Sequence, residues 1–90
     1  MEHIILATAK FVATAPDGET YNVTLTLEPF GGFSYGNGHG LALNRHAGTG
    51  VEWFDARYDP RFNDVVSFNK YATDFVKDHF REDFKIERVA

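Results

Sequence analysis

One short segment, APDGE at residues 15–19, constrains the fold more than any other part of the chain. Pro16 presets the φ angle of the first corner of a type I turn, and Gly18 can take the left-handed conformation that follows it. The segment therefore predicts a three-residue hairpin loop that places Ala15 opposite Glu19. Such a loop fixes the register of the two strands on either side of it.

The flanking residues alternate in that same register. On one face the predicted pairs are all apolar: Ala13 with Tyr21, Phe11 with Val23, Ala9 with Leu25 and Ala7 with Leu27. The other face is polar and mostly threonine: Thr8, Lys10, Thr14, Thr20, Asn22, Thr24, Thr26 and Glu28. A register shift of one residue would turn the apolar set toward solvent. Turn chemistry and alternation thus predict the same antiparallel hairpin.

The segment SFNKYATDFVKDHFRE, residues 67–82, predicts an amphipathic helix. Its apolar residues recur at the spacing of one helical face: Phe68, Tyr71, Ala72, Phe75, Val76 and Phe80. Ser67 or Asp64 can cap its N-terminus. The charged residues fall on the opposite side and form a solvated face.

Two further strands complete the expected order, and a third is left open. Residues 51–58 alternate well enough for a strand, and FKIERV, residues 84–89, predicts a short final one. Whether residues 39–46 form a strand paired with 51–58 stays open, because they include few β-branched residues. The order β-β-(β)-β-α-β predicts a single α+β domain over residues 1–90. It is a two-layer sandwich whose mainly antiparallel four- or five-stranded sheet carries one amphipathic helix on one face.

Residue size predicts where the helix packs. The first strand presents small residues to the core (Ala7, Ala9 and Ala13), and the helix presents bulky ones (Phe68, Tyr71, Phe75 and Phe80). We therefore expect the helix to lie across the first strand, which makes that strand central. Ile4 and Leu6 would then point to the opposite face of the sheet, which one helix cannot cover. A large apolar patch there would indicate a dimer contact or a partner surface.

Composition excludes several functional classes. The net charge is −4 and the nine lysines and arginines are spread along the chain, which disfavours a nucleic-acid or anionic-membrane partner. The absence of cysteine excludes thiol catalysis and disulfides. The start of the chain, MEHIILATAK, resembles neither a signal peptide nor a membrane span. We therefore expect a cytoplasmic protein with no membrane partner, of the kind found among bacterial or phage accessory proteins.

Residues 31–50 hold seven of the eight glycines. The segment GNGHGLA has Leu41 where the phosphate-binding pattern G-x-G-x-x-G needs its last glycine, and no helix follows it. His39 and His46 are an odd number of residues apart, so a strand would place them on opposite faces. We predict no metal site, no cofactor and no catalytic residue, and expect a glycine-permitted loop.

The segment WFDARYDPRF, residues 53–62, is the densest group of polar and aromatic residues. On a strand, Trp53, Asp55 and Arg57 share one face, and Phe54, Ala56 and Tyr58 share the other. Asp55 and Arg57 can pair with each other or with an adjacent strand. Tryptophan beside arginine and a carboxylate is typical of binding hot spots. An ion pair that supports an outer sheet face is the simpler structural explanation.

These observations favour a non-catalytic protein-binding or self-associating module, with a homodimer as one form of self-association, that uses the uncovered sheet face and the glycine-rich loop. The candidate contact residues are Tyr35, His39, His46, Trp53, Asp55 and Arg57. The alternative is a small-ligand or enzymatic site in the glycine-rich loop. A DNA-binding sheet module is a third hypothesis, which the acidic charge opposes.

Overall fold

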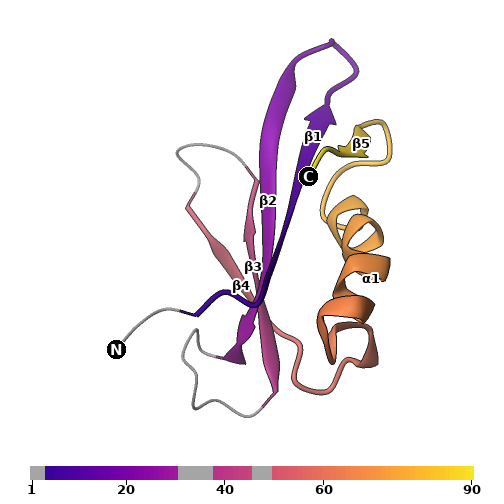
Figure 1. The fold of residues 1–90 in the computed structure, drawn as a ribbon. Coiled ribbons are helices and arrows are strands. Elements are labelled where there is room, and N and C mark those ends of the chain that lie inside the picture. The colour runs from indigo at the N-terminus through magenta and orange to yellow at the C-terminus, as the bar shows by residue number, and fades with distance from the viewer. Residues whose placement is uncertain (1–3, 31–37, 46–49) are drawn as a thin grey trace.

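The sheet is antiparallel and five-stranded, with the spatial order β4-β3-β2-β1-β5. The computed structural model describes residues 4–30, 38–45 and 50–90. Its elements are β1 (Ala7–Thr14), β2 (Thr20–Pro29), β3 (His39–Asn44), β4 (Glu52–Asp55), a 3₁₀ helix (Pro60–Phe62), α1 (Val65–Lys77) and β5 (Lys85–Arg88). Figure 1 shows α1 along one side of the sheet and β5 beside β1. The predicted two-layer α+β sandwich is confirmed.

The hairpin forms as the turn chemistry predicts. All four apolar pairs are found: Ala7 with Leu27, Ala9 with Leu25, Phe11 with Val23 and Ala13 with Tyr21. The Ala15 N–H donates to the Glu19 carbonyl at 2.8 Å and the Gly18 N–H to the Ala15 carbonyl at 2.9 Å. Gly18 has a φ of 91°, the left-handed conformation that the loop requires.

The strand that the sequence left open, β3, is present and lies between β2 and β4. Leu41 pairs with Leu27 on one side and with Phe54 on the other, so β3 joins the hairpin to β4. β4 is shorter than the predicted strand over 51–58, because the Asp55 carboxylate turns back to accept from the Arg57 N–H at 3.0 Å. Tyr58 is therefore 88% exposed and does not share a face with Phe54, as the longer strand predicted.

α1 begins at Val65, directly after one of the two predicted N-cap residues. Asp64 is the N-cap, and its Oδ1 accepts from the Ser67 N–H at 2.8 Å. The helix ends at Lys77, before Phe80, the last apolar residue predicted for its buried face. Phe80 therefore packs from the chain that follows the helix, with its ring centroid 5.5 Å from that of Phe84.

The core lies between α1 and one face of the sheet. Its fully buried large side chains come from both layers: Phe11, Val23, Leu25, Leu27, Leu41, Leu43, Phe62, Phe68 and Val76. α1 contacts β1, β2 and β5, which confirms that it crosses β1. β1 is an interior strand between β2 and β5, although β2 rather than β1 occupies the middle of the sheet.

The other face, here called the open face, carries no helix of the described chain (Figure 1). Along β1 and β2 it is the predicted threonine-rich set, so it is mostly polar there. Ile4 and Leu6 precede β1, and the strand alternation that assigned them to this face does not extend to them. The large exposed apolar groups on the open face instead gather at β4, where Val51 precedes the strand and Trp53 lies within it.

Candidate functional site

Trp53 separates two hollows at the β4 end of the sheet. The residue is 48% exposed, which is high for the largest apolar residue in the protein. A hollow of about 420 Å³ is lined by Phe30, Trp53, Phe54 and Asp55. A second hollow of about 320 Å³ is lined by Thr24, Thr26, Glu28, Ala42, Asn44, Val51 and Trp53. We call these the edge hollow and the open-face hollow.

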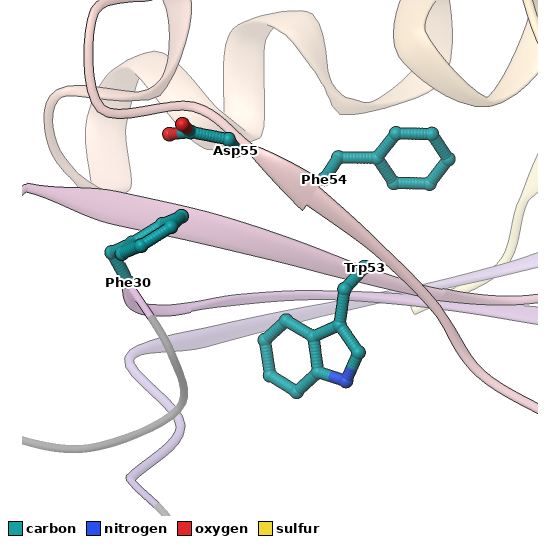
Figure 2. Close-up of a pocket in the computed structure, with 4 residues that line it drawn as sticks. All are labelled: Phe30, Trp53, Phe54 and Asp55. Atoms are coloured by element: carbon teal, nitrogen blue, oxygen red, sulfur yellow. The ribbon is translucent and has the colours of Figure 1, made fainter.

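The edge hollow lies at the end of β4, between that strand and the chain after β2. Figure 2 shows Trp53 and Phe54 projecting from β4 in opposite directions, with Phe30 and Asp55 near the end of the strand. Phe54 points toward the helix layer, where its ring meets that of Phe75 edge-to-face at 5.2 Å. The hollow is thus lined from β4 and, by Phe30, from the chain that follows β2.

The backbone of β4 offers hydrogen-bonding groups at this edge. The Ala56 N–H donates to the His39 carbonyl at 3.1 Å, and Phe54 pairs with Leu41 in the same ladder. Antiparallel ladders alternate, so the backbone groups of Trp53 and Asp55 point away from β3. In the described sheet β4 is an edge strand. Another extended segment could therefore pair with it.

Asp55 and Arg57 form a bidentate ion pair beside the edge hollow. Arg57 Nε donates to Asp55 Oδ1 at 3.0 Å and Arg57 Nη2 to Asp55 Oδ2 at 2.8 Å. The guanidinium carbon also lies 4.0 Å from the centre of the Phe30 ring. The side-chain hydrogen bonds lower the pKa of Asp55 and raise the pKa of Arg57. This confirms the predicted pairing and places a fixed polar group next to an apolar hollow.

Two glycines allow the chain to approach this ion pair closely. Gly38 has a φ of 81°, and a Cβ atom there would lie 3.1 Å from the Arg57 Cα. A Cβ atom on Gly40 would lie 3.3 Å from the Phe54 carbonyl oxygen. This part of the glycine-rich segment is thus required by packing against β4 and the turn after it, whereas the sequence alone indicated only a permissive loop.

The predicted site residues do not all meet. Trp53, Asp55 and Arg57 gather around the end of β4 as described. His39 instead faces the helix layer, where its Nδ1 donates to the Phe62 carbonyl at 2.8 Å, so it ties β3 to the 3₁₀ helix. Tyr35 and His46 lie outside the described residues.

Sequence reasoning missed two residues of this site. Phe30 follows β2 directly and carries no periodic signal, so only the fold brings it to Arg57. Glu28 was assigned to the polar face of the hairpin, but its side chain is buried, with 2% exposed. The sequence signal that could have indicated this residue is the presence of a carboxylate at the end of the threonine-rich face of the hairpin.

No group of three metal-ligating side chains occurs among residues 4–30, 38–45 and 50–90. In the same part of the chain, no helix has the length and apolar character needed to cross a membrane. Comparisons with protein-family models, with curated protein sequences and with solved structures give no match for this chain. Function is therefore inferred from the chemistry of its own residues.

Proposed function

We propose that this protein is a non-catalytic protein-binding module whose contact surface is centred on Trp53. The observation that carries the proposal is the half-exposed Trp53 side chain between two hollows. Binding energy concentrates in a few large side chains near the centre of an interface, and tryptophan is enriched among them. Phe30 and Val51 extend the apolar area on either side of it, and the Asp55–Arg57 pair supplies a polar rim.

The exposed part of Trp53 is large enough to matter energetically. Tryptophan buries up to roughly 250 Å². Covering the 48% that is exposed at roughly 25 cal/mol per Å² gives about 3 kcal/mol before the costs of association. That value is in the range of a measured hot spot.

The edge of β4 supports an extended partner segment. β4 is an edge strand of the described sheet, and pairing with a sheet edge is a recurring way in which proteins bind an extended segment. A second copy of this chain could supply that strand as well as another protein could. Self-association is therefore included in the test.

The two alternative functions have weaker support. The small-ligand alternative is weakened because its candidate binding groups already bind within the protein. The ring of His39 is bonded to the Phe62 carbonyl, and Asp55 and Arg57 bind each other. DNA binding by the sheet is opposed by the net charge of −4 and by an open face on which β1 and β2 present mainly threonine.

The test compares wild type with Trp53→Ala and with the control Val66→Ala, which removes an 80% exposed apolar group on α1. Extended peptides would be selected from a displayed library, and sedimentation equilibrium would measure self-association up to millimolar concentration. Trp53→Ala should weaken the selected interaction by about 30-fold, equivalent to roughly 2 kcal/mol. Val66→Ala should leave it unchanged. The absence of both peptide binding and self-association would overturn the proposal. Equal binding by Trp53→Ala and wild type would also overturn it.

A further inference from the structure

β5 forms the edge of the described sheet that lies opposite to β4. It pairs with β1 on one side only. The Val89 N–H donates to the Lys10 carbonyl at 2.8 Å, which fixes the phase of this ladder. Antiparallel ladders alternate, so the backbone N–H and C=O groups of Ile86 and Arg88 point away from β1. A further strand could pair with these groups.

The side chains along this edge include one base and one acid on the same face. Lys85 lies opposite Thr14 and Glu87 opposite Val12, so both belong to the open face. Both are exposed, and neither forms an ion pair within the part of the chain that the structure describes. Charges on an edge strand usually oppose the pairing of copies. With one charge of each sign, the effect depends on the register.

One antiparallel register of two β5 strands brings opposite charges together. In it Ile86 and the partner's Ile86 form a hydrogen-bonded pair, and each Lys85 lies opposite the Glu87 of the other copy at a position where side chains are closest. A shift by two residues sets Glu87 against the partner's Glu87, or Lys85 against the partner's Lys85, and like charges directly opposite destabilise a sheet. A shift by one residue sets outward backbone groups against inward ones. The charges therefore select a single register.

The helix layer leaves room for a second copy at this edge. Ile86 is half-buried and, with Phe80, Phe84 and charged residues of the same segment, lines a hollow of about 460 Å³. The partner's Ile86 would add apolar contact beside it. α1 crosses β1, and the β1 strands of two paired copies would be three strand spacings apart, roughly 14 Å. A helix is roughly 10–12 Å wide with its side chains, so the two helices fit side by side.

We propose that this protein forms a weak homodimer by antiparallel pairing of β5, with Lys85 of each copy against the partner's Glu87. The two sheets become one continuous sheet across the dimer. This surface lies at the sheet edge opposite to β4, and the inference does not rest on the proposed function. A strand of four residues buries a small area, so the dimer should form only at high protein concentration.

Charge reversal tests the pairing by sedimentation equilibrium up to millimolar protein. Lys85→Glu and Glu87→Lys each place like charges opposite one another in the homodimer, so each variant alone should associate about tenfold more weakly than wild type, or less. An equal mixture of the two variants has opposite charges at both positions and should associate as wild type does. The matched control is the double variant Lys85→Glu/Glu87→Lys, which keeps the composition and the net charge of wild type and should also dimerise.

Backbone amide signals provide a second measurement. Those of Ile86 and Arg88 should shift as the concentration of labelled wild type is raised, and that of Trp53 should not. A wild type that stays monomeric at millimolar concentration would overturn the proposal. Self-association that both single variants retain would overturn it too, as would a monomeric mixture of the two variants when wild type dimerises.

The β5 dimer and the proposed function fail in distinguishable ways. Self-association that Trp53→Ala retains and Lys85→Glu loses would support the β5 dimer, and the Trp53 surface would then be judged by peptide selection alone. Self-association that Trp53→Ala loses and Lys85→Glu retains would refute the β5 dimer and support the Trp53 surface. Peptide selection is carried out on Lys85→Glu, so that a β5 dimer does not contribute to it.

Discussion

Replacing Gly38 with alanine should destabilise the protein by two separable effects. The φ of 81° disfavours any residue with a Cβ atom, by roughly 1–2 kcal/mol. The new methyl group would also lie 3.1 Å from both Cα and Cγ of Arg57. Arg57 cannot yield easily, because its backbone N–H and its guanidinium both bind Asp55 and its guanidinium lies over Phe30. Crowding of this kind costs roughly 1–3 kcal/mol.

Gly18→Ala is the matched control. Gly18 has a similar φ of 91°, but an added Cβ atom there would meet nothing within 4 Å. Both substitutions lower the conformational entropy of the unfolded chain equally, which raises the free energy of unfolding by roughly 0.4–1 kcal/mol in each variant. The difference between the two variants therefore isolates the crowding at Arg57.

Urea unfolding at equilibrium measures that difference. We expect Gly38→Ala to lose at least about 1 kcal/mol more than Gly18→Ala, with unchanged m values. In thermal unfolding the same difference should lower Tm by a further 4–8 °C, roughly, for a domain of this size. Equal losses in the two variants would refute the close approach of Gly38 to Arg57, and with it the packing explanation for this part of the glycine-rich segment.

Two further predictions concern the core and the helix cap. Phe62→Ala should lower the free energy of unfolding by about 3–5 kcal/mol, because Phe62 is fully buried against Phe68 and Phe75; a loss below about 1 kcal/mol in urea unfolding would contradict that placement. The backbone hydrogen bond from Ser67 lowers the pKa of Asp64 below its ordinary 3.8. Its contribution to stability is therefore complete above pH 3.8 and lost as pH falls through the lower folded-state value. Asp64→Asn keeps the cap and should match wild type at pH 7 but lose less stability between pH 4 and pH 2; parallel acid profiles would contradict the cap.

Several parts of the fold could be predicted from the sequence because their signals are local. The APDGE turn and the alternation around it determined the register of β1 and β2 without any tertiary information. The helical spacing of Phe68, Phe75 and their neighbours determined α1 and the face that it buries. The small side chains of β1 indicated where the helix would cross. In each case a few adjacent residues carry both the conformational preference and the burial pattern.

The site was predicted in part for the same reason. Asp55 and Arg57 are two residues apart, so their pairing follows from local geometry. The length of the strand that carries them did not follow, because the Asp55 carboxylate competes with the ladder by binding the Arg57 N–H. His39 was considered a candidate contact residue, but a carbonyl from a distant segment, that of Phe62, determines the direction of its ring.

The sequence alone determined the hairpin, the helix and the apolar face between them, since turn residues and periodicity act over a few positions. The tertiary structure decided where Trp53 lies relative to Glu28 and Phe30, because these residues come from different strands or from the chain just beyond a strand. It also made Glu28 a buried carboxylate, through the pairing of β2 with β3 and of β3 with β4. The distance between strands that are remote in sequence depends on the whole sheet, and no local pattern encodes it.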